Sequence, residues 1–248
     1  MKNYQDDMKF FEIDFEYPNY SYGRYIINRE DDNHDLMVKK GFISLLKNPI
    51  QYKKVNNIVI PDFFIESWHF NDLLWGQGME NSFFINEKVF SILRKYDNPN
   101  FTIYPVNFFY GTEDIPREDF IPISEKMYMV HIIFDNSVKN KIDFQKTTFS
   151  TGVYPGRVFI KENIQIENIE ELNSKWETFE RYDEVVNTEF LFLKKLDKTY
   201  SILLFENLLV RRKNAFYFSE ELANELINNN VSGLYVNNIA CIEVDAIH

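Results

Sequence analysis

The chain has 248 residues, a formal net charge of −11, one cysteine and many aromatic residues, with 24 Phe and 15 Tyr. This acidic balance argues against a general nucleic-acid binder, because phosphate recognition needs clustered Lys and Arg. No run approaches the roughly 20 apolar residues of a membrane span, the N-terminus lacks the pattern of a secretory signal, and a lone cysteine cannot form a disulfide within the chain. We therefore expect a cytoplasmic protein with no nucleic-acid partner and no membrane partner.

Apolar and aromatic runs predict strands along the whole chain. Residues 10–15 alternate apolar with acidic and predict an edge or sheet strand, whereas residues 127–134 are apolar on both faces and predict a central strand. Further apolar runs predict short strands at residues 58–60, 101–106, 157–160, 189–193, 201–205 and 234–236. Helical spacing of apolar residues predicts helices at residues 87–96, within 169–186, and at 219–229.

One pattern occurs twice: a short aromatic strand, a polar residue with a glutamate after it, and an amphipathic helix. The strands are expected at residues 83–85 and 216–218, and the polar residues are Asn86 and Ser219, at an offset of 133 (219 − 86 = 133). Each polar side chain can accept a hydrogen bond from the free amides of the first helical turn, where the following glutamate is also favoured. An apolar run follows each helix, so both copies are predicted to be strand–helix–strand units.

These elements predict an α+β fold with mixed, mainly antiparallel sheets and a few capped amphipathic helices. The two units indicate a two-lobed pseudo-repeat, although two ordinary capped helices with coincidental matches would give the same pattern. We expect an N-terminal lobe of residues 1–150 with the first unit and a C-terminal lobe of residues 151–248 with the second. A single domain of residues 1–248 is the alternative.

Candidate catalytic residues are few. His69 and His131 have no second His or Cys at metal-ligand spacing, and a lone histidine is more often a satisfied core or loop residue. No glycine-rich phosphate loop is present, and Cys241 lies in an apolar stretch that predicts a buried strand. We therefore expect no catalytic residues, no metal and no cofactor.

The order of segments resembles a family of bacterial immunity proteins encoded beside polymorphic toxins. The matching segments, spread over about residues 65–240, are Trp68 with Trp75, residues 84–87, residues 128–131 leading to residues 142–144 and Ser150, residues 218–222, and residues 232–235. Asn86 stands where the family prefers serine, and Ser232 where it prefers threonine. Both replacements keep the capping or turn chemistry, so the implied fold is little affected.

The resemblance implies a non-enzymatic, stoichiometric inhibitor that binds a cognate toxin domain and occludes its active site or another surface that the toxin needs. An acidic inhibitor suits a toxin with a basic surface, such as a nuclease. The candidate contact residues are the acidic group Glu30, Asp31, Asp32 and Asp35. Two alternatives stay open: a scaffold that binds a protein without neutralising it, and a hydrolase using His69 or His131.

Overall fold

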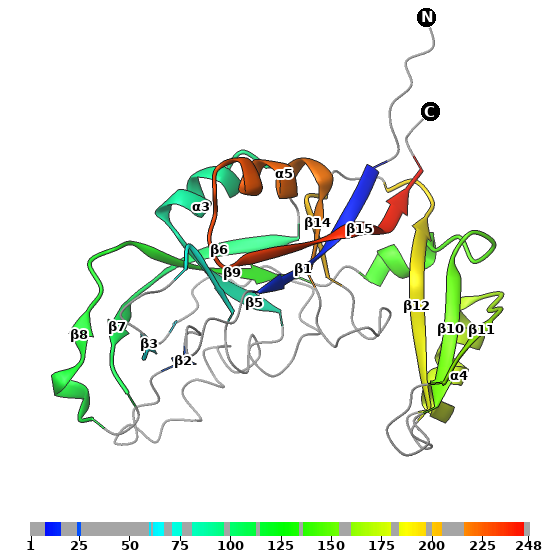
Figure 1. Cartoon of the computed structure of the whole chain (residues 1–248), viewed down its shortest axis with the longest axis horizontal. Helices are drawn as coiled ribbons and strands as arrows, with labels where there is room; N and C mark the ends of the chain where they lie inside the picture. The colour runs from blue at the N-terminus through cyan, green and yellow to red at the C-terminus, as the bar shows by residue number, and fades with distance from the viewer. Residues whose placement is uncertain are drawn as a thin grey trace, which may run out of the picture.

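The computed structural model describes residues 8–15, 24–25, 60, 62–66, 71–75, 81–96, 100–112, 115–133, 136–153, 160–179, 184–196, 200–204 and 216–245. Strands and helices are intermixed along these residues, and the sheets are mainly antiparallel (Figure 1). The predicted α+β class is therefore confirmed.

The described strands form three sheets. The largest has the strand order β11 (Ile160–Ile164), β10 (Thr148–Val153), β12 (Glu184–Leu193), β15 (Leu234–Val244), β1 (Met8–Phe15), β14 (Phe216–Ser219) and β13 (Ile202–Leu204). The second has the order β2 (Arg24–Tyr25), β3 (Phe63–Ile65), β7 (Phe108–Tyr110) and β8 (Ile121–Pro122). The third has the order β4 (Leu73–Trp75), β5 (Ser82–Asn86), β9 (Met127–Ile132) and β6 (Phe101–Val106). Neighbouring strands are antiparallel except in the pairs β12–β15 and β3–β7.

Helix starts follow the predicted capping chemistry. The described helices are α3 (Glu87–Leu93), α4 (Ile169–Phe179) and α5 (Glu220–Asn228), with 3-10 turns η1 (Arg117–Asp119) and η2 (Asn136–Lys141). The Asn86 side chain accepts a hydrogen bond from the Val89 amide at 3.2 Å, and Ser219 accepts one from the Leu222 amide at 3.3 Å. Both predicted N-caps are therefore confirmed.

The two strand–helix–strand segments have matching surroundings. We call β4, β5, α3, β6 and β9 the first unit, and β13, β14, α5, β15 and β1 the second unit. Val130 of β9 pairs with Phe83 on β5 and with Ile103 on β6. Ile13 of β1 pairs with the residues 133 positions later on β14 and β15. The register thus agrees at Val130 and Ile13 on both sides of each central strand, although the pairing of β1 with β15 shifts between Ile13 and Phe11. β9 follows its unit in the chain, whereas β1 precedes its own.

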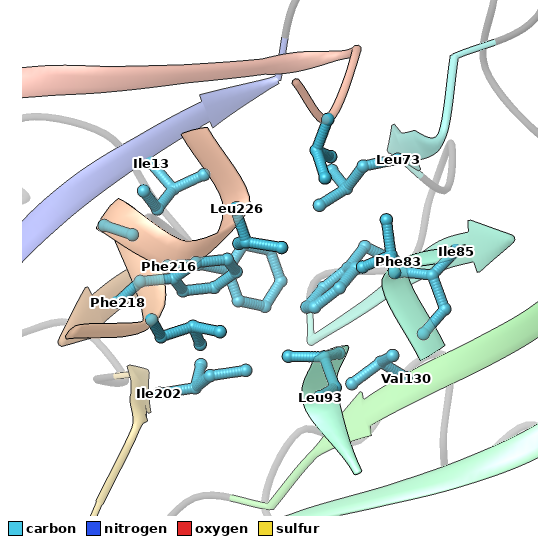
Figure 2. Close-up of a cluster of buried hydrophobic side chains, with 14 of the residues drawn as sticks. Ile13, Leu73, Phe83, Ile85, Leu93, Val130, Ile202, Phe216, Phe218 and Leu226 are labelled. Atoms are coloured by element: carbon cyan, nitrogen blue, oxygen red, sulfur yellow. The ribbon is translucent and has the colours of Figure 1, made fainter. Parts of the chain in front are cut away.

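The two units share one hydrophobic core. Figure 2 shows Phe83 of the first unit facing Phe216 of the second, and their ring centroids lie 5.1 Å apart in an edge-to-face arrangement. Leu93 of α3 and Leu226 of α5 are buried in the same cluster. Figure 1 shows the two helices side by side on the same side of these strands. Each helix therefore buries its apolar face against strands and against the other helix.

Two further clusters extend the core on either side. Phe84 and Met129, on the other face of the first unit's sheet, pack with Phe63 and Phe108 of the β2-β3-β7-β8 sheet. The remaining cluster joins β1, β14 and β15 to β10, β12 and the α4 region. The first unit's sheet is therefore covered on both faces.

Several predicted elements can be compared with this arrangement. The central position of β9, between β5 and β6, is confirmed. The strand at residues 10–15 is not an edge strand: β1 lies between β14 and β15, because the chain start inserts into a sheet made from later residues. Cys241 is half-buried on β15, so the prediction of a buried cysteine is wrong. Residues 58–59 and 157–159 lie outside the described residues.

The division into lobes at residue 150 stays a prediction. β1, from the first segment, pairs with β14 and β15 from the second, and the shared core contains residues of both segments. The single domain of residues 1–248 accommodates these contacts more simply than two lobes do. Among the described helices, none is long and apolar enough to cross a membrane.

Gly233→Ala tests the turn that joins α5 to β15. Gly233 has φ +84°, and a Cβ there would lie 2.1 Å from the Leu73 carbonyl oxygen. We expect the variant to lose at least about 2 kcal/mol of unfolding free energy, because both backbone conformation and space forbid a side chain. Urea denaturation measures the loss. Asn230→Gly is the matched control in the same turn, since Asn230 also has a positive φ, of 50°, and should lose nothing. Equal stability of Gly233→Ala and wild type would contradict the prediction.

Candidate functional site

The predicted contact residues and one candidate histidine lie outside the described residues. They are Glu30, Asp31, Asp32, Asp35 and His69. Their roles stay predictions. Within the described residues, three features bear on function: the surroundings of His131, a polar junction around Asp72, and the outer edge of β15.

His131 lies on β9 inside the core. Its Nδ1 atom is 3.0 Å from the Ser82 hydroxyl oxygen on β5, and its Nε2 atom is 3.5 Å from the Asn81 amide nitrogen. The residue is only 3% exposed, and this burial lowers the pKa of His131 to about 4. The imidazole is therefore neutral near pH 7.

This arrangement does not favour catalysis by His131. A serine activated by histidine must present its hydroxyl to a substrate, and a third group usually orients the base. Ser82 is buried like His131, and the second imidazole nitrogen meets an amide rather than a carboxylate among the described contacts. The described residues also hold no cluster of three His, Cys, Asp or Glu side chains that could bind a metal. The geometry supports the interpretation of His131 as a hydrogen-bonded core residue.

A polar junction around Asp72 connects the two units. The Asp72 carboxylate accepts hydrogen bonds from the Ser232 amide, the Asn86 side chain and Lys88, at 2.9, 2.7 and 2.9 Å. The Asp72 amide in turn donates to the Ser232 hydroxyl at 2.9 Å. Burial opposes ionisation of Asp72, but these hydrogen bonds and the Lys88 charge outweigh it, so the pKa of Asp72 lies below its usual value. The turn after α5 is thereby fixed to the start of β4.

The junction gives structural roles to residues of the family resemblance. Asn86 caps α3 and also donates to Asp72 and to Glu125, at 2.7 and 2.8 Å. Ser232 and Gly233 form the turn that closes on β4, where the Leu73 amide donates to the Ser232 carbonyl at 3.2 Å. These motif residues act as helix caps and turn residues, and in the described contacts none of them is placed as a catalytic group.

The outer edge of β15 carries two exposed apolar side chains whose exposure was not predicted from the sequence. Tyr235 is 61% exposed and Ile239 is 72% exposed. The apolar runs at residues 234–236 and around Cys241 predicted strands, and nothing in them predicted exposed side chains. The signal that could have revealed the exposure is the polar pair Asn237-Asn238, which interrupts the apolar pattern between them.

No protein-family model matches this chain, and no curated protein sequence matches it either.

Replacing His131 should make the unfolding free energy less dependent on pH in the acidic range. The unfolded chain binds a proton at this position near pH 6.5, whereas the folded chain does so only near pH 4. The unfolding free energy should therefore fall as the pH falls from 6.5 to 4, by about 3 kcal/mol from this residue. His131→Gln should lack this component while keeping a partner for Ser82. Urea denaturation of both proteins at pH 7, 5.5 and 4 measures the difference, and parallel stability curves would contradict the assignment.

Asn86→Ser tests the junction with the residue that the family prefers. A serine keeps the helix cap but cannot donate to Asp72 and Glu125 together as the Asn86 amide does. We expect a loss of about 1–3 kcal/mol in unfolding free energy, because these bonds go to carboxylates and Asn86 is buried. Asn228→Ser, at an exposed position of α5, is the control. If Asn86→Ser is no less stable than this control, the donated bonds contribute nothing.

Proposed function

We propose that this chain is a bacterial immunity protein: it binds one cognate toxin domain in the cytoplasm of the producing cell and neutralises it by stoichiometric occlusion, without catalysis. The observation that carries the proposal is the structural role of the residues behind the resemblance. Asn86 and Ser219 cap helices, and Ser232 with Gly233 closes the turn between the units. A family defined by such residues preserves a scaffold, which fits a protein that acts through its surface.

The charge supports the choice of partner. A net charge of −11 attracts a basic protein over long distances and raises its association rate. A toxin that cuts nucleic acid carries the basic surface that such an inhibitor would cover. The acidic group Glu30, Asp31, Asp32 and Asp35 remains our candidate for the first encounter.

A second candidate function is a scaffold that binds a protein without neutralising it. Exposed Tyr235 and Ile239 favour a protein partner in either case, because large apolar side chains of this kind serve as interface anchors. The hydrolase alternative has less support, since His131 and Ser82 are both buried. The genetic neighbourhood separates immunity from scaffolding, because an immunity gene lies directly downstream of its toxin gene.

We also propose that the two units are halves of a pseudo-repeat. Matching caps, matching strand registers and burial of equivalent positions in one core support this proposal. A single core built from both halves would hold the described strands and helices of the two units together as one binding body.

Co-expression with the toxin's C-terminal domain tests the function. Rescue of growth and a co-purifying one-to-one complex are expected.

Reversing the charge of Glu30, Asp31, Asp32 and Asp35 should slow association about tenfold or more at low salt, with the difference shrinking at high salt. The control is an equal reversal at four exposed acids elsewhere, namely Glu118, Asp119, Glu162 and Glu167. Death of the co-expressing cells, with no complex, would contradict the immunity function. An association rate that does not depend on salt would contradict only the electrostatic steering by the acidic group.

A further inference from the structure

The outer edge of β15 differs from an ordinary sheet edge. Over residues 234–241, β15 pairs with β1 on one side, whereas β12 pairs only with residues 242–244. In the part of the chain that the structure describes, no strand pairs with the other side of residues 234–241. Tyr235 and Ile239, both more than half exposed, lie on this stretch.

A bulge in β15 turns Ile239 outward. Val236 pairs with Ile13 and Ala240 with Phe11, so the three residues between them on β15 lie opposite Glu12 alone. The Ile239 amide donates to the Asn237 side chain at 3.2 Å instead of to a strand. Bulges re-aim side chains and interrupt the ladder. A further β-strand would therefore pair poorly with this edge, whereas the exposed Ile239 side chain is available for apolar contact with a partner.

The first unit provides an internal comparison. β6 occupies the place in the first unit that β15 occupies in the second. β6 contains Pro105, which has no amide to offer a further strand, and its large apolar side chains are all at least partly covered. The two edges have equivalent positions in the fold, yet only the β15 edge carries strongly exposed apolar anchors.

Charge distinguishes between the possible occupants. Asp14 lies directly across from Tyr235, and Glu12 lies opposite the bulge, so two carboxylates flank the apolar pair. A second copy of this chain would bring like charges together and would have to pair two bulged edges. A basic protein with an apolar pocket fits both features.

We infer that Tyr235 and Ile239 on the β15 edge are the anchors that bind the cognate toxin domain, with Ile239 inserted into an apolar pocket and basic residues of the toxin facing the carboxylates of β1. This inference rests on the proposed function and assigns it a surface. The acidic group at residues 30–35 would act in the approach, whereas the β15 edge would hold the complex together.

The test measures the affinity of purified variants for the toxin's C-terminal domain, produced with an inactivating substitution. Tyr235→Ala and Ile239→Ser are each expected to raise Kd about tenfold or more, mainly through faster dissociation. Both side chains are exposed, so folding should be retained, and circular dichroism checks it. Ile121→Ser on β8 is the matched control: Ile121 is 49% exposed, and Figure 1 places β8 at the far end of the molecule from β15.

Each outcome decides the inference. A raised Kd for both variants with an unchanged Kd for the control supports the surface. If the wild-type chain rescues growth and binds the toxin domain, but Tyr235→Ala and Ile239→Ser leave Kd unchanged, the assignment of this surface is overturned and the immunity function still stands. If the wild-type chain is a dimer and the variant carrying both Tyr235→Ala and Ile239→Ser is a monomer, the edge binds a second copy of the chain, and the inference is also overturned. Failure of the wild-type chain to bind the toxin domain overturns both the function and the surface.

Discussion

The contact between Phe83 and Phe216 is the interaction on which the rest of the structure depends. Each unit has one helix on four strands, and a unit of that size would be marginal alone because a small domain buries a small share of its surface. Placing the two sheets and helices around one cluster solves this problem, since each unit covers the other's exposed side. Phe15 contacts both rings, at centroid distances of 5.8 and 5.6 Å. The N-terminal strand is thereby part of the same core as residues near the end of the chain.

A shared apolar core does not by itself fix how two units are oriented, because hydrophobic contact has no direction. The polar contacts at its border supply that direction. At one border the Asp72 carboxylate joins the first unit to the turn after α5. Where α3 ends, Lys95 and Tyr96 both bind Glu225 of α5, the tyrosine hydroxyl at 2.7 Å. Burial and the same hydrogen bond raise the pKa of Tyr96. These two sets of contacts restrict sliding and rotation of the helices.

Local signals made part of this fold predictable. Asn86 and Ser219 were identifiable as caps because the capping bond lies within three residues, and the run at residues 127–134 was identifiable as central because both its faces are apolar. The insertion of β1 between β14 and β15 depends on contacts more than 200 residues apart and leaves no local pattern. The half-buried state of Cys241 was not predictable locally either, since among the described strands the pairing of β12 with β15 begins only at Ile242. For the candidate site, His131 was correctly weighed as a core residue, whereas the exposure of Tyr235 and Ile239 was not foreseen.

Equivalent positions in the two units show how one scaffold can carry a binding surface on one side only. By register, His131 corresponds to Asp14 and Met129 to Glu12. The first unit's outer face is covered by β3 and β7, so the positions there are apolar or, like His131, uncharged and hydrogen-bonded. At the second unit the same positions bear carboxylates beside exposed Tyr235, because a charge needs contact with water or a partner. The exposed stretch of β15 around Tyr235 and Ile239 can therefore vary in sequence without loss of the core, which is the freedom that an inhibitor of one particular toxin requires.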